Sequence, residues 1–494
     1  MCGIAGIVGD VDEGLLRRML ESMRHRGPDD LGTFVADGAA IGQTRLSIID
    51  VEGGHQPIPN EDGDSAIVAN GEIYNFRALA KGLDGHELRT RSDSEIPLHL
   101  YEDEGPAAVR RLQGMFALGI WDGGRLFLAR DPVGIKPLYY GTDGGTFYFA
   151  SEMKGLLPAT RRIREFPNGY TYRTDRGFEP FAEWPGQVRA DWTEAAAMDR
   201  ARELLRAAVR SQLVADVPLG TLCSGGLDST LVTALAAEAL DAFHTFSTGM
   251  AGAPDLESAE RAADALGTDH HVRVFTEDEA LDALPTIAAH LESYDAALFR
   301  SAIPTFFVAE AARRHVKVVL TGEGADELYA GYAYLADLPG PAALHGELVR
   351  ITRALHHVNL QRTDRMTMAH SLEARVPFLD WAHVGFALGI PAHLKIHGPE
   401  RVGKWLLRAA FRGAVPEAVL DRKKEKFAEG AGSVGLIRDE ADRQISDAAF
   451  ERDAPRAPVP IRTKEELFCY RMFSERFDLS PDVVRDLVGT TAVY

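Results

Sequence analysis

The chain has 494 residues, 45% of them hydrophobic, and this length is too great for one hydrophobic core, so two domains are expected. The formal net charge of -19 at pH 7 argues against a nucleic-acid partner, because only a short basic cluster at 422–426 opposes it. No segment approaches the roughly 20 apolar residues of a membrane span, so no membrane is expected, and three distant cysteines favour the reducing cytoplasm over a disulfide framework.

The first part of the chain has the pattern of antiparallel strands joined by glycine turns. We expect strands at Arg125–Ala129 and Thr146–Ala150, because each follows an Asp-Gly-Gly turn that favours a hairpin. Helices are expected at Gly14–Arg24 and Phe76–Leu83. Together these elements predict stacked antiparallel sheets with some helices.

A stretch of Gly, Pro and aromatic residues without a clean period, Arg176–Trp192, is interpreted as a linker. An amphipathic helix is expected next, at Thr193–Ala215, and strands and helices then alternate. The expected elements are strands at Leu219–Cys223, Phe243–Thr248, His271–Phe275 and Lys317–Thr321, with helices that include Ser229–Leu240 and Glu257–Leu266. This alternation predicts a parallel sheet with helices on its faces, and ligands bind such sheets at the carboxyl ends of the strands. We therefore place two domains, at 2–185 and 194–494.

The chain begins Met-Cys-Gly-Ile-Ala-Gly. Removal of Met1, which a small second residue permits, would leave Cys2 with both a thiol and a free α-amine. A thiol of pKa about 8.5 beside an amine of pKa about 7.7–8 is a self-contained pair of nucleophile and base. Taken alone, Cys2 also suits a small buried residue, so the neighbouring motifs decide between the two interpretations.

Four motifs follow Cys2: Arg24–Asp29, Arg45–Asp50, Asn70–Asn75 and Ser92-Asp93. With them the sequence resembles the class II glutamine amidotransferases, whose glutaminase domain is an N-terminal-nucleophile hydrolase. The resemblance implies that Cys2 attacks the amide of glutamine, and that the Asn70 side chain and Gly71 amide form the oxyanion hole. It also implies the following glutamine-binding residues: Arg45, Ile49, Asn70, Gly71, Glu72 and Asp93. Of these, Arg45 and Asp93 would hold the α-carboxylate and α-amine by opposite charge.

The hexapeptide Ser224-Gly225-Gly226-Leu227-Asp228-Ser229 follows an expected strand and opens an expected helix. Two glycines let backbone N–H groups approach a phosphate, and a helix N-terminus favours its charge. The motif resembles the pyrophosphate loop of the PP-loop ATP pyrophosphatases. By contrast, Gly398–Lys404 satisfies only the start of a Walker A loop. Trp405 follows where Ser or Thr should ligand Mg²⁺, so we interpret this match as a coincidence that still leaves room for Lys404 near the site.

The acidic run Thr321–Glu327 ends an expected strand and therefore lies at the carboxyl edge of the sheet, where its acids suit Mg²⁺ or a substrate. Further motifs extend the match: Glu292–Asp295, Glu373–Asp380 and Arg422–Phe427. With these the chain resembles the glutamine-hydrolysing asparagine synthetases from residue 2 to about 435. The implied fold is an α+β N-terminal-nucleophile hydrolase sandwich followed by an α/β parallel-sheet PP-loop ATP pyrophosphatase domain.

The resemblance implies ATP and Mg²⁺ as cofactors and assigns roles in the second domain. ATP would be bound by Leu222, Ser224, Gly225, Gly226, Asp228, Ser229, Thr248, Thr321 and Gly322. Asp228 and Asp326 would hold the metal. Glu323 would serve formation of the aspartyl adenylate and the later ammonia step, Arg300 would bind a substrate carboxylate, and Lys424 would stabilise phosphate charge.

The implied substrates are glutamine, ATP and aspartate, and members of the family often form homodimers. One departure keeps a different acceptor carboxylate open: typical members carry two threonines before the arginine, whereas this chain has Ala296-Ala297-Leu298-Phe299-Arg300. A lactam-forming synthetase would usually lack the N-terminal cysteine. A tRNA-thiolating enzyme is expected to be basic, and a non-catalytic relative would not need Cys2, Asp228 and Glu323 together.

Overall fold

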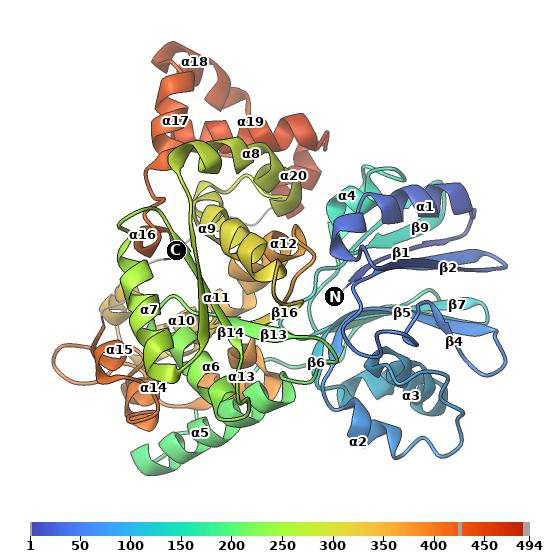
Figure 1. The fold of residues 1–494 in the computed structure, drawn as a ribbon. Coiled ribbons are helices and arrows are strands. Elements are labelled where there is room, and N and C mark those ends of the chain that lie inside the picture. The colour runs from blue at the N-terminus through green and yellow to red at the C-terminus, as the bar shows by residue number, and fades with distance from the viewer. Residues whose placement is uncertain (1, 423–426, 488–494) are drawn as a thin grey trace.

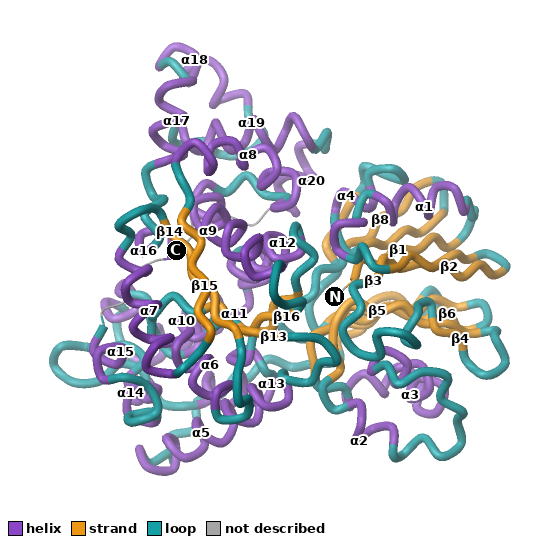
Figure 2. Tube along the Cα trace, viewed as in Figure 1, coloured by secondary structure: helices purple, strands orange, loops and turns teal. Residues whose placement is uncertain are grey.

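The computed structural model describes residues 2–422 and 427–487. Figure 1 shows two halves side by side, the first 180 or so residues forming one and the remainder the other. Figure 2 shows the strands gathered into a stacked pair of sheets in the first half and into one sheet in the second. No helix among the described residues is long and apolar enough to cross a membrane.

The first half contains two six-stranded antiparallel sheets. The first sheet has, in spatial order, β10 (Ile163–Glu165), β8 (Tyr139–Asp143), β9 (Thr146–Ala150), β1 (Cys2–Val8), β3 (Ala39–Arg45) and β2 (Asp30–Ala36). The second has β12 (Gly177–Pro180), β11 (Tyr170–Arg173), β7 (Arg125–Arg130), β6 (Gly114–Asp122), β5 (Ser65–Ile73) and β4 (Ile58–Pro59). Strand β1 is buried along nearly its whole length, which explains its apolar run Cys-Gly-Ile-Ala-Gly-Ile-Val.

Helices cover the outer faces of both sheets, so the half has an αββα layering (Figure 1). Its helices are α1 (Glu13–Glu21), α2 (Phe76–Ala80), α3 (Ile96–Glu104) and α4 (Met153–Leu156). Helices α1 and α4 lie outside the first sheet, and α2 and α3 lie outside the second. A core of residues from the facing sheets, including Ile4, Val68 and Phe149, fills the space between them.

The second half is built on a parallel sheet with helices on both faces. Its strand order is β15 (Asp269–Val274), β14 (His244–Gly249), β13 (Leu219–Leu222), β16 (Val318–Leu320) and β17 (Glu373–Arg375). All four neighbouring pairs are parallel. The carboxyl ends of β13, β14 and β16 therefore open on the same edge.

The helices of the second half connect these strands and then form the C-terminal tail. They are α5 (Glu194–Ser211), α6 (Leu227–Ala237), α7 (Pro254–Leu266), α8 (Glu277–Leu291), α9 (Ala296–Arg313), α10 (Ala325–Leu328), α11 (Pro341–Arg353), α12 (Asn359–Met368), α13 (Trp381–Gly389), α14 (Trp405–Ala410), α15 (Glu417–Asp421), α16 (Phe427–Gly430), α17 (Leu436–Gln444), α18 (Asp447–Asp453), α19 (Lys464–Arg476) and α20 (Pro481–Leu487). Helix α20 packs back against β10, so the tail contacts both halves.

The predicted fold class is confirmed: antiparallel sheets come first and a parallel sheet follows. The expected strand at Thr146–Ala150 coincides with β9. The predicted linker is partly wrong, because β12 at Gly177–Pro180 pairs with β11 and extends the second sheet. Its four residues are too few for a readable alternation of apolar and polar side chains. Phe181 still packs on the first half, where its N–H donates to the Gly169 carbonyl at 2.9 Å, whereas Trp184 reaches the second half and meets Trp381 edge to face.

Buried charged residues join the two halves. The Arg26 guanidinium contacts Glu152 at 2.6 Å within its own half and Asp364 of α12 at 2.8 Å across the interface. Arg365, the next residue of α12, contacts Glu292 of its own half at 3.2 Å and lies 3.8 Å from Glu152 of the first half. All these side chains are nearly or fully buried. Removing one partner of such a pair typically costs about 3–5 kcal/mol, so the relative placement of the halves is strongly specified.

Candidate active site

Cys2 is the first residue of β1 and pairs across the sheet with Arg45, the last residue of β3. The Cys2 side chain is buried, and burial raises the pKa of its thiol. The Cys2 nitrogen donates to Asn70 Oδ1 at 3.1 Å, and the Cys2 carbonyl oxygen accepts from Arg26 Nε at 3.0 Å. Both backbone groups of the predicted nucleophile are therefore fixed in position.

Asn70 lies on β5, which faces β1 between the two sheets. Its side-chain nitrogen Nδ2 is buried and has no hydrogen-bond partner among the described residues. A buried donor without a partner costs stability, and a ligand oxygen placed beside Cys2 could satisfy this one. The amide of Asn70 thus holds Cys2 with its oxygen and leaves its N–H groups available to an incoming ligand.

Gly71 follows at a φ of +150°, a backbone conformation that side chains rarely adopt. A Cβ atom there would lie 2.0 Å from the backbone oxygen of Met115 on β6. Only glycine fits this close approach of two strands. The requirement explains why glycine follows Asn70 in the motif.

Arg45 ends β3, and Ile49 lies in the loop that follows. The Arg45 guanidinium donates to the carbonyl oxygens of Ile49 at 3.1 Å, Asp50 at 2.7 Å and Val51 at 3.1 Å. These bonds wrap residues 49–51 around a buried positive charge. Ile49 therefore contributes a backbone carbonyl that orients Arg45.

Asp93 and Glu72 are both buried but have different partners. Asp93 Oδ2 accepts from the Ile73 N–H at 2.7 Å, and burial raises the Asp93 pKa to about 6. The Glu72 carboxylate lies 3.2 Å from Arg375 of β17, across the domain interface. Glu72 thus connects the predicted glutamine site to the second half.

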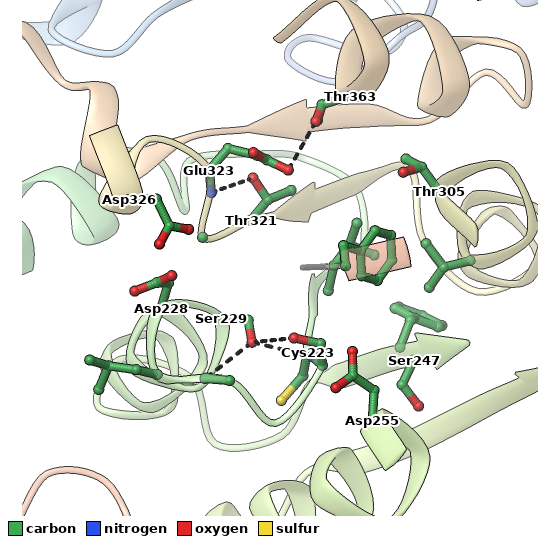
Figure 3. Close-up of a pocket in the computed structure, with 18 of the residues that line it drawn as sticks. Cys223, Asp228, Ser229, Ser247, Asp255, Thr305, Thr321, Glu323, Asp326 and Thr363 are labelled. Atoms are coloured by element: carbon green, nitrogen blue, oxygen red, sulfur yellow. Dashed lines mark hydrogen bonds between the residues drawn. The ribbon is translucent and has the colours of Figure 1, made fainter. Parts of the chain in front are cut away.

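A pocket of about 170 Å³ opens at the carboxyl edge of the parallel sheet. Ten predicted residues of the adenylating half line it together: Leu222, Ser224, Gly226, Asp228, Ser229, Thr248, Thr321, Gly322, Glu323 and Asp326. Figure 3 shows Asp228 and Asp326 facing each other across this pocket. Gly225 lies within the same loop at a φ of +72°, where a Cβ atom would be 2.3 Å from the backbone of Ser258.

The side-chain ammonium group of Lys404 lies between Asp228 and Asp326, the two predicted metal ligands. Lys404 Nζ lies 2.6 Å from Asp228 Oδ2 and 2.5 Å from Asp326 Oδ1. Lys404 itself is buried at a φ of +56°, and its N–H donates to the Tyr329 carbonyl at 2.9 Å. The two carboxylates converge on one point, as ligands of a hard cation would. Of the Walker-like stretch Gly398–Lys404, Lys404 alone is among the residues that line the described pocket.

Glu323 follows the carboxyl end of β16, and two residues of α12 hold its carboxylate. Arg362 forms an ion pair with Glu323 Oε1, and Thr363 Oγ1 donates to the same oxygen at 3.3 Å (Figure 3). The Glu323 N–H donates to Thr321 Oγ1 at 3.4 Å. The carboxylate is thereby oriented on the rim of the pocket.

Arg300, predicted to bind a substrate carboxylate, pairs here with a carboxylate of the chain itself. Its Nε and Nη2 donate to the Glu465 carboxylate of α19 at 2.7 and 2.6 Å. Arg300 is also absent from the residues that line the described pocket. The neighbouring apolar residues Leu298 and Phe299 are buried in the hydrophobic core. Lys424 lies outside the described residues.

Sequence reasoning missed several pocket residues. They are Ser247, Asp255, Thr305, Val308, Thr363, Arg408, Arg422 and Phe427. Ser247 and Thr305 had no local motif, because each reaches the pocket only through the packing of its element. Arg422 and Phe427 did carry a signal, since they begin and end the Arg422–Phe427 motif.

Comparisons with known proteins agree with this geometry. Residues 1–168 match a family described as glutamine amidotransferase domain, and residues 200–340 and 335–478 match the asparagine synthase family. An Escherichia coli protein named asparagine synthetase B (glutamine-hydrolyzing) is 37% identical over 97% of this chain and 92% of its own length. An Arabidopsis thaliana glutamine-hydrolyzing asparagine synthetase is 36% identical over 97% of this chain and 87% of its own. A probable asparagine synthetase of Schizosaccharomyces pombe is 37% identical over 97% and 94%. Matches of this extent at both domains show that the chain belongs to the family of glutamine-hydrolysing asparagine synthetases.

Proposed function

We propose that this chain makes asparagine from aspartate, glutamine and ATP. The Cys2 thiol adds to the glutamine amide and expels ammonia, and water then hydrolyses the thioester to glutamate. In the second half the aspartate side-chain carboxylate displaces pyrophosphate from ATP to give aspartyl-AMP. Ammonia then displaces AMP. The main support is the pairing in one chain of a nucleophile beside an unused buried amide donor with a pocket formed by the phosphate loop.

The residues of the second site suit this chemistry. The loop from Ser224 to Ser229 would receive the phosphates at the N-terminus of α6. Asp228 and Asp326 would hold magnesium brought by ATP, and the metal would neutralise phosphate charge. Lys404 supplies a further positive charge at the same place. Lys424 is proposed to stabilise phosphate charge, on the family resemblance alone.

Aspartate is the favoured acceptor over a different carboxylate. The relatives are named asparagine synthetases, and none of the residues 296–299 that make up the departure lines the described pocket. For Arg300 to bind the acceptor, it would exchange the Glu465 carboxylate for that of the substrate. We also propose a cytoplasmic homodimer, on the family resemblance, and light scattering of the purified protein tests the assembly.

A screen of acceptor carboxylates tests the function directly. Pyrophosphate release is measured with ATP, magnesium and one acid at a time, with glutamine or ammonium as the nitrogen source. We expect aspartate to give the highest kcat/KM. Glutamate is the matched control, because it has one more methylene group than aspartate. Turnover of another acid with aspartate inert would reject asparagine synthesis while leaving the amidotransferase assignment intact.

Asn70→Ala is expected to lower kcat for glutamine hydrolysis by about 100–1000-fold, because an oxyanion donor is lost. Asn70→Asp keeps an oxygen to accept from the Cys2 N–H but lacks the donor, so it should lose a similar factor. If the hydrogen bond from the Cys2 N–H to Asn70 Oδ1 also matters, kcat should be lower in Asn70→Ala than in Asn70→Asp. Ammonium-dependent synthesis should be unchanged in both, and near-parental hydrolysis in Asn70→Asp would contradict the assigned role.

Glutamine binding is expected to weaken below about pH 6, because the raised pKa of Asp93 means that its carboxylate becomes neutral there. A neutral Asp93 no longer attracts the α-ammonium of glutamine, so KM for glutamine should rise as the pH falls. The measurement is glutaminase KM between about pH 5 and pH 8. Asp93→Asn should show a high KM that does not change through this range. A flat profile in the parent protein would remove Asp93 from amine binding.

A further inference from the structure

A cluster of histidines and carboxylates lies on the helical layer outside the second sheet of the glutaminase half. Glu61 comes from the loop between β4 and β5, His86 from the loop after α2, and His99 and Glu102 from α3. Each of the four offers one ligand atom, and these atoms all lie within 4.8 Å of one another. The four residues take no part in the chemistry described above.

The distances within the cluster are within about 0.4 Å of those expected around one metal ion, with Glu61 facing His86 through Oε1 and His99 through Oε2. His86 Nδ1 lies 3.0 Å from Glu61 and 3.7 Å from Glu102 Oε2. His99 Nδ1 lies 2.9 Å from Glu102 Oε2 and 3.7 Å from Glu61. Tetrahedral bonds of about 2.0–2.2 Å place neighbouring ligand atoms about 3.3–3.6 Å apart. The four observed distances bracket that interval.

The ring nitrogen of each histidine that points away from the cluster, Nε2, also contacts a carboxylate, as in known metal sites. His86 Nε2 contacts Asp103 Oδ1 at 3.2 Å, and His99 Nε2 contacts Glu95 Oε1 at 3.3 Å. A carboxylate behind each imidazole fixes the ring and leaves Nδ1 to face inward, the arrangement found behind metal-bound histidines. His99 is 1% exposed, so this order is built into the fold rather than into a mobile surface.

The carboxylate ligands have outer partners too. Asn60 Nδ2 donates to Glu102 Oε1 at 2.8 Å, which leaves Oε2 for the centre of the cluster. The Glu87 N–H donates to Glu61 Oε1 at 3.0 Å. Every one of the four ligand side chains is thus oriented by a second group.

We propose that Glu61, His86, His99 and Glu102 form a binding site for a divalent first-row transition metal, with Zn²⁺ as the probe. Two imidazoles with two carboxylates suit such an ion better than Mg²⁺ or Ca²⁺, which prefer oxygen ligands. Four protein ligands close the coordination shell, which is the arrangement of a structural site. The ion would join three segments that are far apart in the sequence.

The site is connected to the glutamine pocket through Glu95. That carboxylate contacts His99 and also accepts from the N–H groups of Arg89 and Thr90, each at 2.7 Å. The loop it holds runs directly into Asp93. A bound ion would therefore stiffen the loop that positions Asp93, so glutamine KM is a secondary readout.

Protonated histidines are the alternative explanation of the same contacts. Glu61, Glu95, Glu102 and Asp103 all face the two rings, and imidazolium ions would also satisfy these carboxylates. The two explanations differ in one respect: only the metal site takes up a stoichiometric ion at neutral pH. Because binding requires neutral imidazoles, uptake should also weaken as the pH falls.

The chain offers an internal control in a second histidine group. His244, His271 and His315 also place ligand atoms within 4.8 Å of one another, at the amino-terminal edge of the parallel sheet. The carboxylate that contacts two of them, Asp269, is 63% exposed. Lacking a comparable buried set of outer partners, this group is expected to bind metal weakly.

The experiment uses the full chain, treated with chelator and then titrated with Zn²⁺ by calorimetry at pH 7.5. We expect one tightly bound Zn²⁺ per chain, confirmed by elemental analysis after dialysis, and a melting temperature raised by about 5 °C at saturation. His86→Asn and Glu102→Gln should each weaken this binding at least about 100-fold, and Asp103→Asn about 10-fold. His271→Asn should leave it unchanged.

Absence of a stoichiometric ion, or binding lost in His271→Asn but kept in His86→Asn and Glu102→Gln, would overturn the proposal. Substitution with Co²⁺ provides a second measurement that does not depend on variants. Tetrahedral coordination by these ligands gives strong visible absorption, whereas adventitious surface binding leaves the weak spectrum of the hydrated ion. Circular dichroism of each variant confirms that the fold is intact before its affinity is compared.

Discussion

Replacing Cys2 with alanine is expected to reduce glutamine-dependent asparagine formation by on the order of 10⁴-fold or more. The amide of glutamine is unreactive toward water, and the variant keeps only the donors around the site. Synthesis from ammonium should remain near the parental rate, because the second pocket is intact. The measurement compares the two nitrogen sources in the same preparation.

Cys469→Ala is the matched control, since Cys469 is equally buried but lies in the core of the second half. It should keep both activities. If Cys2→Ala still hydrolysed glutamine, the nucleophile would be elsewhere. Mass spectrometry adds an independent check: fully active protein that retained its initiator methionine would exclude the α-amine of Cys2 as the base.

Glu323→Gln is expected to lower aspartate-dependent pyrophosphate release by about 10³-fold or more. The substitution keeps the size of the side chain but removes the negative charge that pairs with Arg362. A group oriented by two α12 residues on the rim of the pocket is suited to handle the adenylate and the incoming ammonia. Glutamine hydrolysis should be retained, because Glu323 lies in the other half.

Glu310→Gln serves as the charge-matched control, since Glu310 forms ion pairs with Arg273 and Arg314 at the surface. It should leave both half-reactions unchanged. Loss of pyrophosphate release and glutaminase together in Glu323→Gln would mean that the division of labour between the halves is wrong.

Local motifs were enough to place most of the second pocket. The Ser224–Ser229 loop and the Thr321–Asp326 run each follow a strand of one parallel sheet, so the fold class alone brings them to a common edge. The same holds for Cys2 and Arg45, which pair in register across β1 and β3. In these cases the sequence separation is large, but the geometry of the sheet determines the distance.

The partners of some predicted residues depend on tertiary contacts without a local pattern. Lys404 reaches Asp228 only because its backbone adopts a left-handed conformation held by Tyr329. Arg300 meets Glu465 because the C-terminal helices fold back over α9. Neither contact leaves a trace in spacing or periodicity. The short β12 was missed for a simpler reason, since four residues carry too little pattern.

Helix α12 has a further consequence for how the two reactions keep pace. Arg362 and Thr363 contact Glu323. The next residue, Asp364, forms an ion pair with Arg26. Arg26 Nε in turn donates to the carbonyl oxygen of Cys2 at 3.0 Å. Residues 362–364 lie within one turn of α12, so a displacement of the helix that alters the Arg362–Glu323 contact would also alter the Asp364–Arg26 contact. If the acceptor binds more tightly to one position of α12 and glutamine does too, each ligand must raise the affinity for the other by the same factor. Helix α12 thereby gives the protein a physical route to hydrolyse glutamine mainly when the acceptor is bound.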